Sequence, residues 1–437
     1  YPYAAISAFA LHPMYLRLQE VIKKDQTNLI APFQKQMDEL NAMPEIDYDG
    51  VMQLKWQLLK LIYEENGKKE LATAGFKKFF KQNEHWLVSY SAFSYLRDLH
   101  GSVDFNSWPT YSKFDQKEVD QLTGARSKTY HDIAFYYFVQ YHLHLQLSES
   151  AKYAHENGVV LKGDIPIGVY RYGADAWQHP DLFHMDMQAG APPDDFAVKG
   201  QNWGFPTYNW EVMASNDYSW WKLRFEQMSF YFDAFRIDHI LGFFRIWSIP
   251  MDQVEGIMGR FVPAIPIAQQ ELDKKGISVD MDRYTKPFIN EAVLFTYFGY
   301  DNEYAKQHFV KSMQDGKYQL LPNFQTQRSV EAYFKILPND EWHLKMQQGL
   351  YNLISNVILF KGDDTQTYHF RFNMEGTLSF QNLDEKSKNA LRDLYVNYFF
   401  IRQDNAWEKE ALNKLPMLKK STNMLICGED LGLVPNC

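Results

Sequence analysis

The segment FYFDAFRIDH, residues 230–239, predicts a buried β-strand that ends in charged residues. Apolar side chains predominate as far as Ile237, as they do in strands of parallel sheets that are covered on both faces. Upstream, Asn216 and Asp217 are of the type that caps a helix, and the helix they would begin runs up to this strand. A helix followed by a buried strand is the repeating unit of an α/β protein.

Two further helix-then-strand units have the same form. Their helices are expected over residues 131–156 and 391–407, and their strands over residues 159–161 and 424–427. Each of the three strands leads to an acidic side chain, which is Asp164, Asp238 or Glu429. Parallel strands with acidic residues at their carboxyl ends favour a (β/α)8 TIM barrel, an α/β fold whose site lies on that face. A doubly wound sheet is the alternative architecture.

Two long stretches lie outside these units. Residues 14–130 are expected to form a helical subdomain, because their apolar residues recur at helical spacing. The interval between Asp238 and Glu429, about 190 residues, is too long for one step of a barrel and predicts an inserted subdomain over residues 255–400. We therefore expect residues 1–437 to be a catalytic barrel that contains both subdomains.

The composition argues against two classes of partner. The formal net charge of -9 lacks the basic excess of a nucleic-acid surface, and no stretch is apolar for long enough to cross a membrane. The two cysteines, Cys427 and Cys437, are too few for a disulfide framework, so we expect a reducing, cytoplasmic location. Aromatic residues make up 16% of the chain, which serves either core packing or the stacking of sugar rings.

Asp238 and Glu429 are the candidate catalytic pair. Cleavage of a glycosidic bond with retained configuration needs two carboxyl groups about 5–5.5 Å apart, one a nucleophile and one an acid that later acts as a base. Arg236 and Asp238 are two residues apart on a strand, so their side chains share a face and the guanidinium can orient the carboxylate. A structural ion pair at a strand end explains these two residues equally well.

Glu429 and Asp164 each have two interpretations. A general acid must carry a proton when the reaction starts, and Glu429, which follows an apolar strand and precedes Asp430, fits that role. An exposed acidic loop is the alternative for Glu429. Asp164 can hydrogen-bond a sugar hydroxyl or cap the adjacent turn.

Five short motifs occur along the chain. They are GDIPI (163–167), APPD (191–194), QNWGFP (201–206), RIDH (236–239) and GEDLG (428–432). Together, and in this order, they resemble the amylomaltases of glycoside hydrolase family 77. The opening Tyr1-Pro2-Tyr3 and the long insert are most similar to the plant-type cytosolic disproportionating enzymes of that family.

The resemblance implies a 4-α-glucanotransferase that transfers glucosyl or maltooligosyl units between α-1,4-glucans, with Asp238 as nucleophile and Glu429 as acid/base. It implies maltose, maltooligosaccharides and branched glucans as partners, and neither a metal nor another cofactor. The implied substrate-binding residues are Tyr3, Ser7, Asp164, Asp194, Gln201, Trp203, Arg236 and His239. An α-glucan hydrolase and a non-catalytic glucan-binding protein are the alternative functions, and a core position is the alternative for Trp203.

One expected element of the family is absent from the sequence. The resemblance implies a third catalytic aspartate in a His-Asp-Asn motif downstream of the acid/base, and no such motif lies between Glu429 and Cys437. The chain also opens with Tyr1 rather than with a methionine, which indicates an internal start. We therefore expect the chain to be truncated at both ends.

Overall fold

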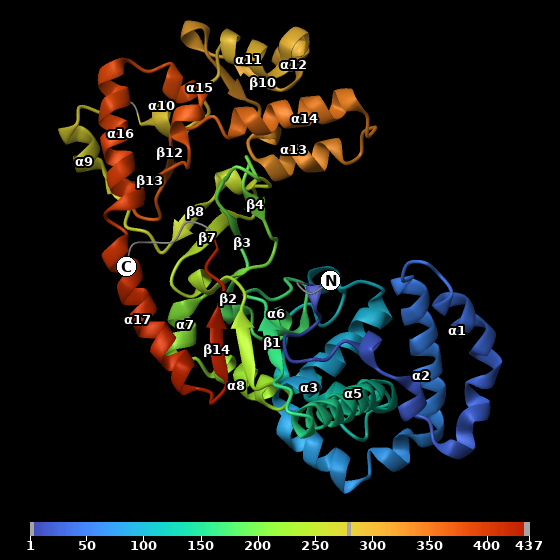
Figure 1. The fold of residues 1–437 in the computed structure, drawn as a ribbon. Coiled ribbons are helices and arrows are strands. Elements are labelled where there is room, and N and C mark those ends of the chain that lie inside the picture. The colour runs from blue at the N-terminus through green and yellow to red at the C-terminus, as the bar shows by residue number, and fades with distance from the viewer. Residues whose placement is uncertain (1–3, 278–280, 432–437) are drawn as a thin grey trace. The chain divides into compact units, whose positions relative to one another are not determined.

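The computed structural model describes residues 4–277 and 281–431, which form two compact units (Figure 1). Unit 1 comprises Tyr1–Phe183, Tyr208–Asp238 and Leu418–Gly428, and unit 2 comprises His184–Thr207, His239–Met417 and Glu429–Cys437. The chain passes between the units within the short strands β2 (Phe183–His184) and β5 (Thr207–Tyr208). Each unit is therefore built from segments that are far apart in the sequence.

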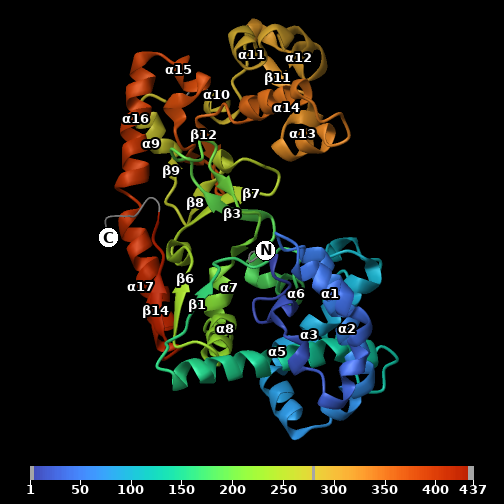
Figure 2. The same ribbon diagram turned by 45° about the vertical axis from the view of Figure 1, so that its right-hand side comes forward.

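The parallel sheet of unit 1 has the strand order β1-β6-β14 over the described residues (Figures 1 and 2). The strands are β1 (Lys162–Ile165), β6 (Ala234–Ile237) and β14 (Leu425–Gly428). In the register of this sheet, Asp164 lies opposite Arg236, and Gly428 lies opposite Ile237. The α/β class predicted from the sequence is confirmed, and the strands of all three predicted helix-then-strand units meet here, although β6 begins at Ala234 rather than at Phe230.

The first strand begins later than its apolar run predicts. Val159 and Val160 are 49% and 71% exposed, and β1 starts at Lys162. Pairing with β6 begins at Lys162, opposite Ala234, so the two valines precede the hydrogen-bonded ladder. Asp164 consequently lies inside the strand rather than after it.

The helices of unit 1 pack largely through aromatic side chains. They are α1 (Gln34–Asn41), α2 (Tyr48–Glu70), α3 (Ala74–His100), α4 (Gln116–Thr123), α5 (Tyr130–Glu156), α6 (Ala174–Gln178), α7 (Trp210–Ser215) and α8 (Ser219–Ser229). Helices α3 and α5 lie side by side in both views (Figures 1 and 2), and the rings of Phe76 and Phe79 lie 5.5 and 5.4 Å from that of Tyr141. The helix predicted over residues 131–156 is confirmed as α5.

Helix α8 packs directly against the central strand β6. The rings of Phe225 and Phe235 stack with centroids 4.9 Å apart, and both side chains are fully buried. On the same helix, the Arg224 guanidinium donates to the carbonyl of Pro166, which follows β1, at 2.8 Å and lies 4.9 Å from the ring of Trp221. The helix thus fixes both β6 and the segment after β1.

The described residues of unit 2 form three antiparallel sheets. A four-stranded sheet has the order β4-β3-β7-β8, a three-stranded sheet has the order β12-β13-β9, and β10 pairs with β11. The strands are β3 (Met187–Ala191), β4 (Gln201–Asn202), β7 (Ile246–Pro250), β8 (Arg260–Val262), β9 (Ile267–Ala268), β10 (Val310–Ser312), β11 (Tyr318–Leu320), β12 (Leu359–Lys361) and β13 (Thr367–Phe370). A buried cluster that includes Trp247 and Trp407 forms one core of this unit, and a second cluster centres on Phe298 and Leu350.

The helices of unit 2 begin after β9. They are α9 (Gln269–Lys274), α10 (Asp282–Thr285), α11 (Glu291–Phe298), α12 (Asn302–His308), α13 (Gln327–Phe334), α14 (Glu341–Ile354), α15 (Leu378–Gln381), α16 (Glu385–Phe400) and α17 (Asp404–Lys420), of which α17 continues into unit 1. The helix predicted over residues 391–407 is interrupted between α16 and α17. There the buried Gln403 side chain accepts from the backbone N–H of Ile265 at 2.7 Å and donates to its carbonyl at 3.0 Å. Among the described residues, no helix has both the length and the apolar character needed to cross a membrane.

Phe225→Ala should lower the free energy of unfolding by about 3–5 kcal/mol, because it leaves a cavity between α8 and β6. Urea unfolding followed by circular dichroism measures this loss. Phe230→Ala removes the same ring from a position that is 39% exposed, and its effect should be about 1 kcal/mol or less. Equal losses in the two variants would contradict the packing described for α8.

Candidate active site

The Arg236 side chain lies between two carboxylates at the end of β6. Its Nε and Nη2 donate to Oδ1 and Oδ2 of Asp164 at 3.0 and 2.8 Å, and its Nη2 also donates to Oδ1 of Asp238 at 3.3 Å. The geometry follows from the register, since Asp164 lies opposite Arg236 on the neighbouring strand and Asp238 lies two residues further along β6. The expected ion pair on one face of the strand is present.

The backbone continues the sheet for one residue beyond β6 and then turns sharply. The N–H of Asp238 donates to the carbonyl of Ile165 at 3.0 Å, which extends the pairing with β1. The next residue, His239, has φ of 53°, in the left-handed region that residues other than glycine adopt at a cost of about 1–2 kcal/mol. This turn directs the backbone N–H of His239 toward a side chain of unit 2.

That side chain is Glu429, and backbone N–H groups hold both of its carboxyl oxygens. His239 donates to Oε2 at 2.8 Å, and Leu431 donates to Oε1 at 2.7 Å. The Glu429 carbonyl also accepts from the N–H of Ile240 at 2.9 Å. Glu429 is partly buried, whereas Leu431 in the adjoining loop is 76% exposed. The two hydrogen bonds therefore fix the orientation of the carboxyl group beside a loop that is open to solvent.

Trp203 lies beside His239 in unit 2. The two rings meet edge to face with centroids 5.2 Å apart, and the indole also stacks on Phe205 at 5.7 Å. The Trp203 Nε1–H donates to Oε1 of Gln201 at 2.9 Å. Trp203 remains partly exposed, in contrast to fully buried tryptophans such as Trp247, so part of its ring is open to a ligand.

The remaining predicted contact residues have different surroundings. Asp194 is exposed, and its Oδ1 accepts from the N–H groups of Phe196 and Ala197 at 2.9 and 2.6 Å, which closes a turn. Ser7 is only 3% exposed, and its hydroxyl donates to Oδ1 of Asp175 at 3.1 Å. Tyr3 lies outside the described residues. The structure therefore groups Asp164, Arg236 and Asp238 in unit 1 and Gln201, Trp203, His239 and Glu429 in unit 2.

Asp175 is a buried carboxyl group that the sequence analysis did not single out. Its Oδ2 accepts from the backbone N–H of Ala8 at 2.7 Å, so it ties the first described loop to α6. Burial raises the pKa of Asp175 to about 6, although the hydrogen bonds from Ala8 and Ser7 and the charge of Arg224 oppose that rise. An aspartate between two alanines and two residues before a tryptophan, as in residues 174–177, is the signal that could have revealed it.

A solved structure shares this fold. The amylomaltase from Streptococcus agalactiae, determined in complex with acarbose, matches 91% of this chain and 88% of its own, with a TM-score of 0.54 and 21% sequence identity. At that identity the likeness is one of fold. The class that fold and site define is therefore an α/β protein with the amylomaltase fold and a carboxylate-rich strand end.

The family follows from the sequence comparison. A family model described as 4-alpha-glucanotransferase, glycoside hydrolase family 77, matches residues 1–437, and the chain belongs to that family. The chain is 42% identical over 454 residues to the 4-alpha-glucanotransferase DPE2 of Oryza sativa subsp. japonica, covering 100% of this chain and 46% of that protein. It is 35% identical over 268 residues to the 4-alpha-glucanotransferase of Chlamydia pneumoniae, covering 61% and 49%. The resemblance found in the motifs is confirmed, and the chain spans about half the length of these relatives.

Asp175→Asn should change how stability depends on pH. Because the pKa of Asp175 is about 6 in the folded state and 3.8 in its ordinary state, the folded protein takes up a proton as the pH falls through 6 and gains stability relative to the unfolded chain. As the pH falls from about 7 to 4.5, the free energy of unfolding of the wild type should rise by about 2 kcal/mol relative to that of the variant, because the asparagine side chain takes up no proton. Urea unfolding of both proteins at these two pH values measures the difference, and a difference independent of pH would contradict the assignment.

Proposed function

We propose that this chain supplies the nucleophile and the acid/base of a 4-α-glucanotransferase that transfers glucosyl or maltooligosyl units between α-1,4-glucans with retained configuration. The observation that carries the proposal is the placement of Asp238, held by Arg236, at the end of the central strand in a chain that belongs to family 77. We propose maltose and maltooligosaccharides as donors and branched glucans as acceptors, in a reducing, cytoplasmic location. An inserted subdomain over residues 255–400 and a helical subdomain over residues 14–130 remain part of the proposal.

Asp238 is the proposed nucleophile. One of its carboxylate oxygens attacks the anomeric carbon of the donor, and the bond from that carbon to the leaving oxygen breaks. The hydrogen bond from Arg236 to Oδ1 orients the carboxylate, and the second ion pair of Arg236, with Asp164, keeps the guanidinium in place. A positioned nucleophile enters the reaction without the entropy loss of becoming ordered.

Glu429 is the proposed acid and base. Its carboxyl proton passes to the leaving oxygen in the first step. In the second step its carboxylate takes a proton from the acceptor hydroxyl, whose oxygen attacks the anomeric carbon while the bond from that carbon to Asp238 breaks and releases the aspartate. The hydrogen bonds from His239 and Leu431 occupy one lone pair on each oxygen. Since each carboxyl oxygen has two lone pairs, a position for the transferred proton remains.

Trp203 is the proposed stacking surface for a sugar ring. Its edge-to-face contact with His239 and the hydrogen bond to Gln201 restrain the indole, and an aromatic ring held in this way binds the apolar face of a pyranose at a low entropy cost. Asp164, Asp194, Gln201, Arg236 and His239 are proposed contacts to sugar hydroxyls. Ser7 and Tyr3 complete the proposed set, although Ser7 acts from a buried position.

Asp238→Asn in the full-length protein should reduce maltose disproportionation by at least about 10³-fold while leaving thermal unfolding nearly unchanged, because an amide is a far weaker nucleophile. Asp217→Asn is the matched control, since the Asp217 side chain is 81% exposed, and it should retain activity. Turnover within a few-fold of wild type in Asp238→Asn would remove Asp238 from its role.

Glu429→Gln should block transfer from maltose but should still form the glycosyl-enzyme from a donor whose leaving group needs little protonation. With an aryl α-glucoside as donor, we expect a rapid initial release of phenolate followed by slow turnover. The absence of a burst would contradict the assignment of Glu429 as acid/base.

Maltose together with a branched glucan should yield free glucose and a lengthened acceptor in equal amounts. The new bond should have the α configuration, because two displacements at one carbon restore it. Nuclear magnetic resonance of the product measures the configuration. Inversion would contradict the double displacement, and release of two glucose molecules per maltose without chain extension would favour the hydrolase.

A further inference from the structure

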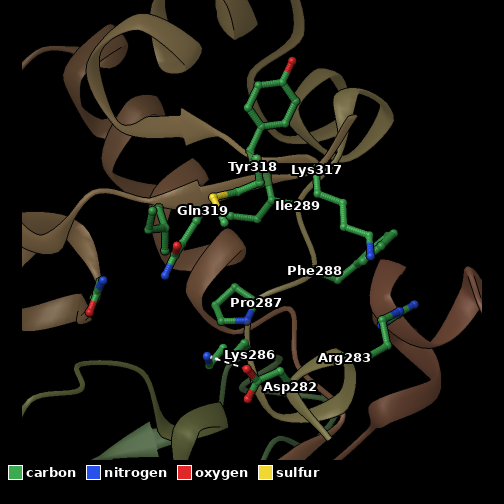
Figure 3. A pocket seen from close by; sticks show the side chains of 12 residues that line it. Asp282, Arg283, Lys286, Pro287, Phe288, Ile289, Lys317, Tyr318 and Gln319 are labelled. Carbon is green, nitrogen blue, oxygen red and sulfur yellow. Dashed lines mark hydrogen bonds and ion pairs between the residues drawn. The ribbon is translucent and has the colours of Figure 1, made fainter. Parts of the chain in front are cut away.

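Unit 2 contains a pocket of about 420 Å³ whose lining includes no residue of the candidate active site (Figure 3). It is lined by α10 and the segment that follows it, by the β10–β11 hairpin, and by Gln325. Its volume falls within the range of small-molecule sites, which is roughly 300–1,000 Å³. The pocket belongs to the region between Asp238 and Glu429 whose role the motifs leave open.

Arg283 provides a fixed positive charge in this pocket. Its guanidinium donates to the hydroxyl and the carbonyl of Ser379 at 2.7 and 2.8 Å, and it lies over the ring of Phe288 at 4.0 Å. These contacts come from α15 and from the segment after α10, so the orientation of the guanidinium is set by two parts of the fold. A cation positioned in this way pays little entropy when it binds an anion.

Lys317 brings a second positive charge to the same side. Its side chain extends from the β10–β11 hairpin toward Phe288 and Arg283 (Figure 3). Of the lining residues, three are cationic, namely Arg283, Lys286 and Lys317, and one is acidic, namely Asp282. The Asp282 carboxylate is engaged by Lys286 at 2.6 Å, so within the described lining no acidic side chain is left to balance Lys317.

The lining also contains neutral polar groups and apolar ones. Gln319 and Gln325 belong to it together with Ile289, which is 2% exposed, and Leu320, which is 3% exposed. The Tyr318 ring points away from the pocket in Figure 3, and its hydroxyl donates to Glu291 at 3.1 Å. The lining therefore supplies amide donors and acceptors, which suit hydroxyl groups, and apolar side chains, which suit the carbon face of a sugar ring.

We propose that this pocket binds a sugar phosphate, with the phosphate group at Arg283 and Lys317 and the sugar hydroxyls at Gln319 and Gln325. Charge-assisted hydrogen bonds from a guanidinium and an ammonium are the contacts that a phosphate dianion prefers. The proposal goes beyond the proposed transferase function and uses none of its residues. Inorganic phosphate shares the anionic part of this chemistry, so the sugar part must be tested separately.

Isothermal titration of the full chain with glucose 6-phosphate, inorganic phosphate and glucose tests the proposal. We expect saturable binding of one glucose 6-phosphate per chain, weaker binding of inorganic phosphate, and little binding of glucose. Lys317→Gln should weaken glucose 6-phosphate binding by about tenfold or more, because a hydrogen bond to a charged group is lost. Lys335→Gln is the matched control, since Lys335 is an exposed lysine of unit 2 that does not line the pocket.

A second variant separates the sugar from the anion. Gln319→Ala should weaken binding of glucose 6-phosphate but not of inorganic phosphate. Equal affinities of the two ligands for the wild type would show an anion site and would overturn the assignment of a sugar phosphate. No saturable binding up to about 10 mM, or equal affinities in the wild type and Lys317→Gln, would overturn the site altogether. Asp238→Asn should bind glucose 6-phosphate as the wild type does, so a failure of the transferase proposal would leave this result unchanged.

Discussion

The placement of the candidate nucleophile depends on one guanidinium group. Arg236 spans the distance between two neighbouring strands of the parallel sheet, because its donors reach Asp164 on β1 and Asp238 at the end of β6. A planar guanidinium has a fixed array of donors, so a lysine at this position would hold neither carboxylate in the same geometry. The strand that carries Arg236 is anchored by the buried side chains of Phe235 and Ile237 on its other face, and Phe235 stacks on Phe225 of α8.

The candidate acid/base is held by a different device. Glu429 receives its hydrogen bonds from backbone N–H groups rather than from side chains, and the left-handed conformation of His239 directs one of them. Backbone donors cannot be removed by a side-chain substitution, so the orientation of Glu429 depends on the local path of the chain. The two candidate catalytic carboxyl groups are thus positioned differently. Asp238 is held by a side chain whose place follows from the sheet register, and Glu429 is held by the backbone of a turn.

Sequence patterns predicted the elements that depend on local residues. Helix α5 differs from the prediction by one residue at its start, because its apolar periodicity and the Asn157-Gly158 stop are local signals. The start of β1 was wrong because pairing with β6, and not the apolarity of Val159 and Val160, determines where a strand begins. The break between α16 and α17 depends on Gln403, whose partner Ile265 lies far away in the sequence.

The contacts of the candidate site also divide into those that local sequence predicts and those that depend on distant residues. The pairing of Arg236 with Asp238 was predictable, because residues two apart on a strand share a face. The link from Arg236 to Asp164 and the backbone bond from His239 to Glu429 were not, since each joins distant segments. Ser7 was expected to contact substrate through the resemblance alone, and that contact stays a prediction, while its hydrogen bond to the buried Asp175 was visible only in the structure.

Strand β14 completes the parallel sheet of unit 1, and it is synthesised long after β1 and β6. The rate of translation therefore sets the earliest time at which this sheet can form. His239 and Glu429 are 190 residues apart, and at about 5–20 residues per second that interval takes roughly 10–40 s to synthesise. During this time β6 has β1 on one side and no β14 on the other, so one edge of a strand that carries a candidate catalytic residue is open to other chains. Folding of unit 2 within this interval would shorten the flexible chain between β6 and β14 and lower the entropy cost of pairing them. The insert would thereby reduce the time during which the edge of β6 can pair with another chain.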